Sequence, residues 1–227
     1  MASIRFDVIS IGTLSRNRLW NEQQAVRTAH ATTTLIRTPQ HNILVDPGLP
    51  APALAAHLFE RTGLGPEKID TVFLTNFRPA HRAGLELFDR SRLLISEVEQ
   101  QATAQYLESL LAEAPTEDLD RKIIERERRL LDKLHPAPDQ LDENVDLFPL
   151  YGYTPGNCGL LLSLPTITAL IAGDAAATQD HFLAGQVLPD AQDIHTAQES
   201  LQEIYEIADL IVPGHDNLFL NPRTYGI

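Results

Sequence analysis

The hydrophobic pattern along this chain switches between the period of a β-strand and the period of an α-helix. Short runs rich in apolar and β-branched residues predict strands. The predicted strands cover 4–11, 32–37, 43–45, 71–74, 93–95, 146–151, 159–164, 168–172 and 209–212. Apolar residues at three- and four-residue steps predict helices over 51–61 and 190–208. This order of elements indicates an α/β chain of the α+β type, in which two sheets lie between outer helices.

The segment from Glu97 to Leu134 has a different pattern, because strong helix formers and charged residues follow one another with one break. The break is Ala114-Pro115-Thr116, after which Thr116 and Glu117 can start a second helix. Apolar residues gather near one face of this second arm: Leu119, Ile123, Ile124, Leu130, Leu131 and Leu134. We expect a helical hairpin, inserted at 97–134 in a single domain of residues 1–227.

Two roles for the hairpin stay open. It is either an amphipathic pair with a solvated face that packs on the core, or a lid or homodimer contact.

Composition narrows the class of partner. The chain has 227 residues, with 18 Lys and Arg against 31 Asp and Glu, so its formal net charge is -13. An acidic protein repels phosphate backbones and anionic lipid surfaces, so neither nucleic acid nor a membrane is an expected partner. No apolar stretch reaches the roughly 20 residues that a membrane-spanning helix needs.

Cysteine usage and the first residues indicate the compartment. The single cysteine, Cys158, excludes an intramolecular disulfide. Residues 1–7 lack a basic start followed by a long apolar run. We therefore expect a reduced, cytoplasmic setting.

Five short motifs occur in series between positions 44 and 216. They are Leu44-Val45-Asp46-Pro47-Gly48, the loop 75–84, Tyr153-Thr154-Pro155-Gly156-Asn157, Ala172-Gly173-Asp174 and Val212-Pro213-Gly214-His215-Asp216. Each motif is weak alone, but together their order and spacing resemble the metallo-β-lactamase superfamily. The resemblance implies an αββα sandwich of two mixed sheets flanked by helices, with the site where these loops converge at the open edge between the sheets.

The loop 75–84 resembles the family's His-x-His-x-Asp-His-x-Gly loop in its length, its flanking elements and its last histidine only. The resemblance implies a site for two adjacent zinc or iron ions, which activate a bridging water for hydrolysis. The three imidazoles of the first ion correspond to Asn76, Arg78 and Asn157. An amide oxygen is a poor zinc ligand, and a guanidinium has no lone pair to give. We therefore expect the first ion site to be absent.

The four ligands of the second ion correspond to Ala80, His81, Asp174 and His215, so one carboxylate is replaced and three donors remain. Two imidazoles and a carboxylate can hold one zinc, manganese or ferrous ion. We expect either no metal or one weakly held divalent ion. Arg78 is predicted to replace the missing charge by pairing with Asp174.

Two function classes follow from this ligand set. In the first, the chain lacks binuclear metal-dependent hydrolase activity, and the former active site is a polar cleft suited to a small anionic ligand or to none. The residues expected to line this cleft are Asn76, Arg78, His81, Asn157 and His215. In the second, the chain is a mononuclear metal-dependent hydrolase whose candidate catalytic and metal-binding residues are His81, Asp174 and His215.

Four other residues have candidate roles. Asp46 resembles a structural carboxylate that orients the histidine loop in this family, although a turn residue at a strand end is also consistent with its position. Cys158, directly before an apolar strand, is typical of a buried small hydrophobe. His30 and His181 are weaker candidates for substitute metal ligands.

Overall fold

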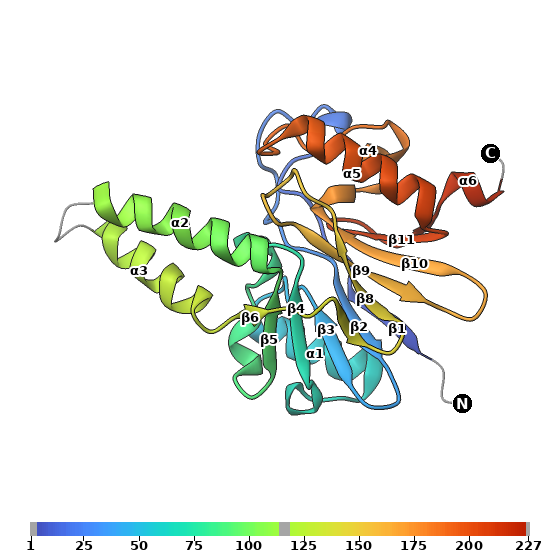
Figure 1. Cartoon of the computed structure of the whole chain (residues 1–227), viewed down its shortest axis with the longest axis horizontal. Helices are drawn as coiled ribbons and strands as arrows, with labels where there is room; N and C mark the ends of the chain where they lie inside the picture. Colours follow the sequence, from blue (N-terminus) through green and yellow to red (C-terminus); the bar gives the residue numbers. More distant parts are fainter. Residues whose placement is uncertain (1–3, 114–118, 226–227) are drawn as a thin grey trace.

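The computed structural model describes residues 4–113 and 119–225, and these fold into two sheets packed face to face (Figure 1). The first sheet has the order β1 (Arg5–Ser10), β2 (Thr33–Arg37), β3 (Asn42–Val45), β4 (Thr71–Leu74), β5 (Arg92–Ile95) and β6 (His135–Pro136). The second has the order β12 (Phe219–Leu220), β11 (Leu210–Pro213), β10 (Thr168–Gly173), β9 (Cys158–Ser163), β8 (Val145–Pro149) and β7 (Gln140–Asp142). Each sheet combines parallel and antiparallel pairs, as the sequence predicts.

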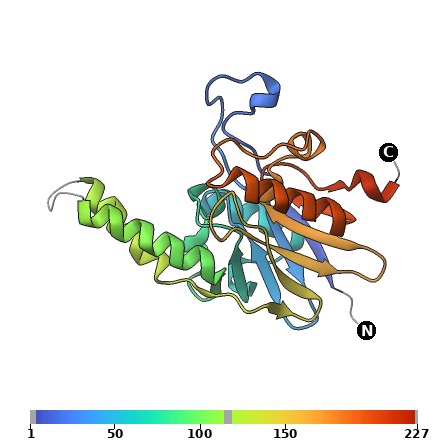
Figure 2. The ribbon, with the colours of Figure 1, turned by 45° about the horizontal axis from the view of Figure 1, so that its top comes forward.

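Helices cover the outer faces of the two sheets, so the predicted αββα sandwich is confirmed (Figures 1 and 2). The α-helices are α1 (Ala51–Thr62), α2 (Glu97–Glu113), α3 (Leu119–Leu131), α4 (Gln179–Leu183), α5 (Ile194–Ile207) and α6 (Pro222–Tyr225). Short 3-10 turns lie at Arg18–Trp20, Pro66–Lys68, Pro79–His81, Leu85–Phe88 and Asp174–Ala176. None of the described helices is long and apolar enough to cross a membrane.

The alternation of side chains along each strand separates the core into layers. In β3, Val45 points between the sheets and packs in the cluster that also holds Phe73 of β4 and Val212 of β11. Leu44 points the opposite way, into the cluster with Leu58 of α1. Burying side chains of this kind stabilises the fold by about 1.5–3 kcal/mol each. Both faces of β3 are therefore apolar, and the alternating direction of its side chains places one face against the second sheet and the other against α1.

The predicted helical pair is present as α2 and α3, which lie side by side and extend away from the sheets (Figures 1 and 2). Leu131 is fully buried where α3 returns to the body of the protein, whereas Leu119 and Ile123 are 70% and 52% exposed. Self-association through the hairpin stays a prediction. The predicted break at 114–116 and the start at 117 lie outside the described residues.

One helix begins later than the sequence pattern predicts. The helix predicted over 190–208 is α5, which starts at Ile194 because the Asp193 side chain accepts a hydrogen bond from Thr196 N (3.0 Å) and caps it. Residues 190–193 therefore form part of a loop, and Asp190 is free to lie beside the site described below. The cap of α4 is similar, since the Thr178 side chain accepts a hydrogen bond from His181 N.

Strand directions bring the five sequence motifs to one edge of the sandwich. β3 runs parallel to β4 in the first sheet, and β10 runs parallel to β11 in the second. Residues that follow these four strands therefore come out at the same edge. The contact between Thr32 N and Gly214 O (2.7 Å) links the two sheets there.

Candidate functional site

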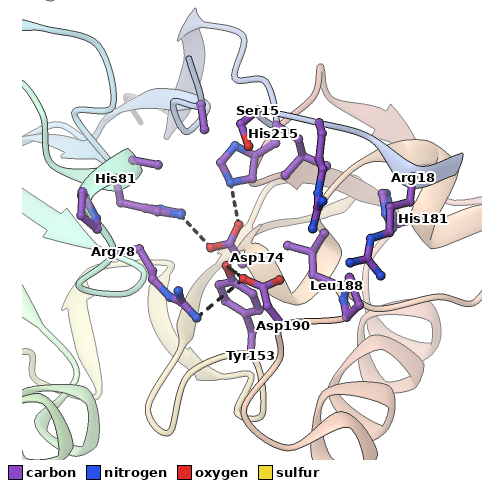
Figure 3. A pocket seen from close by; sticks show the side chains of 16 residues that line it. Ser15, Arg18, Arg78, His81, Tyr153, Asp174, His181, Leu188, Asp190 and His215 are labelled. Atoms are coloured by element: carbon purple, nitrogen blue, oxygen red, sulfur yellow. Dashed lines mark hydrogen bonds and ion pairs between the residues drawn. The ribbon is translucent and has the colours of Figure 1, made fainter. Parts of the chain in front are cut away.

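His81 is the centre of the site, and both of its ring nitrogens face carboxylates. It lies on the 3-10 turn Pro79–His81 and is fully buried. Its Nδ1 is 3.0 Å from Asp46 Oδ2, and its Nε2 is 2.8 Å from Asp174 Oδ2 (Figure 3). Thr75 Oγ1 donates to Asp46 Oδ2 (2.7 Å), so its proton is not available to His81. Nδ1 must therefore carry a proton that it donates to Asp46 or Thr75.

Two unusual backbone conformations hold this geometry. Asp46, which follows β3, has a φ of 50°, a left-handed conformation that Asp tolerates better than most residues. Its Oδ1 accepts a hydrogen bond from Thr75 N (2.9 Å), so it fixes the start of the loop after β4. Gly173 has a φ of 55°, and a Cβ there would lie 2.6 Å from Thr75 Oγ1. A glycine is therefore needed directly before Asp174.

His215 approaches Asp174 from the opposite side to His81. Its Nε2 lies 2.9 Å from Asp174 Oδ1, and its Nδ1 lies 3.0 Å from the backbone oxygen of His30. Asp174 Oδ1 is nevertheless a buried oxygen without a hydrogen bond of acceptable geometry. The distance gives an ion pair when His215 is protonated, but the alignment does not give a hydrogen bond. The imidazole of His30 makes a separate contact, to the Ile11 oxygen (3.1 Å).

The charges of the centre follow from these contacts. Burial alone would lower the pKa of His81, but the carboxylates of Asp174 and Asp46 outweigh it and raise the pKa to about 10. Burial would raise the pKa of Asp174, but His81 and His215 hold it well below its ordinary value. At neutral pH, His81 is thus a cation between two carboxylates, which gives Asp174 a buried partner inside the protein.

Asn76 and Asn157, two of the three residues that the resemblance assigns to the first ion, are fully buried and bonded to each other. Asn76 Oδ1 accepts from Arg78 N (3.0 Å), which orients the amide so that Nδ2 donates to Asn157 Oδ1 (3.1 Å) and Asp174 Oδ2 (3.0 Å). Asn157 Nδ2 donates to Leu150 O (3.0 Å). Hydrogen bonds within the chain therefore occupy the polar atoms of both amides.

Arg78 does not pair with Asp174, so that prediction is wrong. Its guanidinium lies 4.9 Å from the centre of the Tyr153 ring, and its Nη2 is 3.9 Å from Asp190 Oδ2 (Figure 3). Tyr153 also donates its hydroxyl proton to Asp190 Oδ2 (3.4 Å). The late start of α5 leaves Asp190 within reach of Arg78, and His81 already supplies the cation that Asp174 needs.

A pocket of about 430 Å³ opens above the centre (Figure 3). His81, Asp174 and His215 form part of its lining, and so do Arg78 and His181. The sequence interpretation missed the other wall, which the segment after β1 supplies. The residues of that wall are Leu14, Ser15, Arg16, Arg18 and Ala29. The segment that forms this wall has the hydrophobic period of neither a strand nor a helix. The two arginines in Ser15-Arg16-Asn17-Arg18 were the only feature of the sequence that could have indicated it.

The sequence profile of the metallo-β-lactamase superfamily matches residues 27–215, which include the whole of this centre. The chain belongs to the metallo-β-lactamase superfamily. No curated protein matches this metallo-β-lactamase-fold chain by sequence.

Solved structures share its fold at low sequence identity. A metallo-β-lactamase from Thermotoga maritima, so described in its crystal structure, has a TM-score of 0.70 and 16% identity, covering 96% of this chain and 99% of that one. AidC, a dizinc quorum-quenching lactonase, has a TM-score of 0.64 and 17% identity over 90% of this chain and 80% of its own. AiiA from B. thuringiensis, with N-decanoyl-L-homoserine bound, has a TM-score of 0.62 and 18% identity over 95% and 93%.

This metallo-β-lactamase-fold chain brings together a group of donor atoms that could hold a metal ion. Among the described residues, His81, Asp174 and His215 each offer one donor atom, and these atoms lie within 4.8 Å of one another. Asp174 Oδ1 has no hydrogen bond, which leaves it free to act as a ligand. Both imidazoles also hold Nδ1 against a carboxylate or a backbone oxygen, the arrangement that orients metal-binding histidines. The donor set therefore fits a single divalent ion.

Proposed function

We propose that this chain is a metallo-β-lactamase-fold protein without binuclear hydrolase chemistry, and that its pocket binds a small anionic ligand above the His81, Asp174 and His215 centre. The hydrogen-bonded amides of Asn76 and Asn157 carry the first part of the proposal. Both side chains are fully buried and bonded within the chain, so neither has a free donor atom for an ion. The third position holds Arg78, whose guanidinium repels a cation.

The balance of charge in the pocket supports an anionic ligand. His81 compensates Asp174, and Arg78 lies beside Asp190, so both acidic residues of the lining have a cationic partner. Arg16 and Arg18 are left without an acidic partner among the described residues. The pocket is therefore positive in a chain whose formal net charge is -13. An anion is the complementary ligand.

One divalent ion can join this centre, with His81, Asp174 and His215 as its ligands. Zinc, manganese and ferrous iron all accept two imidazoles and a carboxylate. Such an ion, when bound, supplies Lewis acidity and lowers the pKa of a bound water. Asp46 and the His30 backbone oxygen orient the two imidazoles, and Asn76 donates to the carboxylate oxygen that faces away from His215. Any ion must displace the proton on His81 Nε2, which favours weak binding.

A mononuclear hydrolase is the second candidate function. The observation that favours it is the outer hydrogen bonding of His81 and His215, since both rings are oriented as ligands. In that case the same three residues hold the ion, and the pocket arginines hold the substrate. The solved structures of similar fold include lactonases, which shows the fold but not the reaction.

Metal content and turnover test the proposal together. Protein purified without added metal and then dialysed against zinc should hold at most one equivalent by elemental analysis. Two tightly bound equivalents would contradict the proposal. A panel of esters, thioesters and phosphodiesters, with and without chelator, should show no turnover. Chelator-sensitive turnover that is lost in His215→Ala and kept in His195→Ala would favour the mononuclear hydrolase, since His195 is an exposed residue of α5.

A further inference from the structure

His181 is a buried imidazole in the pocket wall that the proposed metal centre does not use. It lies in α4 and is 4% exposed, and it is one of the residues that line the pocket (Figure 3). Its Nδ1 is 2.8 Å from Thr178 Oγ1, whereas its Nε2 has no hydrogen bond within the described residues. One ring nitrogen is therefore left for a ligand.

The hydrogen bonds around Thr178 determine which nitrogen of His181 carries the proton. Thr178 Oγ1 accepts from His181 N (3.2 Å), as the cap of α4. The hydroxyl proton then needs an acceptor, and His181 Nδ1 is the one that the structure provides. Burial also lowers the pKa of His181, which keeps the ring neutral. The neutral ring with Nδ1 as acceptor has its proton on Nε2, which is thus a hydrogen-bond donor.

Arg16 and Arg18 line the same pocket as His181. Both side chains are exposed, and within the described residues neither forms an ion pair. Arg16 makes one long hydrogen bond, to Gln23 O (3.4 Å). Figure 3 shows Arg18 on the same side of the pocket as His181. Two guanidinium groups and an imidazole N–H are thus available to one ligand.

The turn that carries Arg18 is fixed to the helix that carries His181. Asn17 is 1% exposed and caps the turn, its Oδ1 accepting from Leu19 N (2.9 Å). Trp20, at the end of the turn, donates Nε1–H to Asp180 Oδ2 (2.7 Å), and Asp180 directly precedes His181 in α4. The backbone that carries Arg18 is therefore held beside α4 before a ligand arrives, so binding has to order only the exposed arginine side chains.

We infer that His181 Nε2, Arg16 and Arg18 form an oxyanion subsite, which binds the carboxylate or phosphate group of a small molecule whose remainder extends toward the His81, Asp174 and His215 centre. The inference rests on the proposed anion-binding function. It places the groups that bind the anion in the segment after β1 and in α4. Guanidinium groups suit both kinds of oxyanion, because their N–H groups match two oxygens at once.

Calorimetric titration with three probes tests the subsite: phenyl phosphate, benzoate and uncharged benzyl alcohol. The full chain should bind at least one of the two anions and bind the alcohol at least tenfold more weakly. Arg18→Gln, Arg16→Gln and His181→Phe should each weaken anion binding about tenfold, since each removes a charge-assisted hydrogen bond. His181→Gln keeps an N–H donor and should retain more affinity than His181→Phe. The probe that binds more tightly identifies the anionic group.

The controls separate this inference from the proposed function. Arg90→Gln removes an exposed arginine that does not line the pocket, and should leave binding unchanged. Thermal unfolding of each variant reports whether the fold is kept. If the wild type binds an anion and none of the substitutions Arg18→Gln, Arg16→Gln and His181→Phe weakens that binding, the subsite is wrong. The proposed function is then unaffected. If the wild type binds neither anion, or binds the alcohol equally well, both the subsite and the proposed anion-binding function are wrong. The elemental analysis remains a separate test of the His81, Asp174 and His215 centre.

Discussion

Two neighbouring clusters share the carboxylate of Asp174 but differ in what they leave open. The amide pair, Asn76 and Asn157, is fully buried, and each amide nitrogen and oxygen has a partner within the chain. The donor triad, His81, Asp174 and His215, is also buried but lines the pocket, and Asp174 Oδ1 has no hydrogen bond. The amide pair is thus a self-contained part of the core, whereas the donor triad has an oxygen that can still accept a ligand.

The contacts of the two clusters show which groups of the chain stabilise the buried charges of Asp174 and His81. Asp174 keeps a charged partner in His81 and a neutral donor in Asn76, at 2.8 and 3.0 Å from the same oxygen. Asp46 balances the other side of His81. A protonated imidazole and the amide of Asn76 therefore stabilise the buried carboxylate of Asp174. Substitutions in the two clusters should have different effects on stability and on ligand binding.

Asp174→Asn should have the largest effect, because it leaves the His81 cation without its closest partner. We expect the free energy of unfolding to fall by about 3 kcal/mol, the scale for removing one member of a buried ion pair. Zinc binding should be lost with it. Urea unfolding measures the first change, and elemental analysis measures the second. Asp89→Asn, in an exposed turn, is the matched control and should change stability by less than about 0.5 kcal/mol.

A stability loss as small as that of the control would mean that Asp174 is not held as a buried ion. The ionic contacts of His81 with Asp46 and Asp174 would then not be what stabilises the centre.

Asn157→Ala should have a smaller effect, confined to stability. The change removes the acceptor of Asn76 Nδ2 and the donor to Leu150 O, and leaves buried polar groups with fewer partners. The expected loss is about 1–3 kcal/mol. Zinc stoichiometry should stay the same, because Asn157 is outside the donor triad. Asn217→Ala, on the exposed surface after β11, is the control.

The comparison between the clusters would break down if Asn157→Ala altered zinc stoichiometry. That result would place the amide pair among the ligands rather than in the core.

The order of the predicted elements and the five motifs predicted the sandwich, because the strands that build its core are short, apolar and separated by clear turns. The strand at 71–74 was predicted with the bounds that the structure shows. The donor triad was also identified from the sequence, since the loops that carry it follow strands at fixed positions of a known pattern. The fold and the clustering of His81, Asp174 and His215 are therefore properties that a one-dimensional pattern can predict.

The partner of Arg78 could not be predicted in the same way. Asp174 and Asp190 both line the pocket that Arg78 also lines, and the choice between them depends on the loop at 190–193. The helix predicted from the apolar pattern of α5 included that loop. The hydrogen bond from Thr196 N to the Asp193 side chain places the start of the helix at Ile194 instead. Arg16 and Arg18 were missed because the segment that carries them is irregular. Its position depends on distant contacts such as Trp20 with Asp180.

The smallest expected effect is on the reactivity of the Cys158 thiol. Because Cys158 directly follows Asn157, its reactivity depends on how tightly the chain packs around the amide pair. Burial raises the pKa of this thiol to about 11 from an ordinary 9.0, so about a hundredfold less thiolate forms at pH 8.5. The unfolded thiol ionises first as the pH rises. The contribution of Cys158 to stability is therefore complete below pH 9 and is lost as the pH rises through about 11.

Alkylation with iodoacetamide at pH 8.5, followed by mass spectrometry, measures this protection. Cys158 is the only cysteine of the chain, so the mass change has one source. The folded wild type should react far more slowly than the same protein in urea. Asn157→Ala should react faster than the wild type, because the loss of the amide pair loosens the packing at the start of β9. Equal rates for the folded variant and the wild type would show that Cys158 is shielded independently of the amide pair.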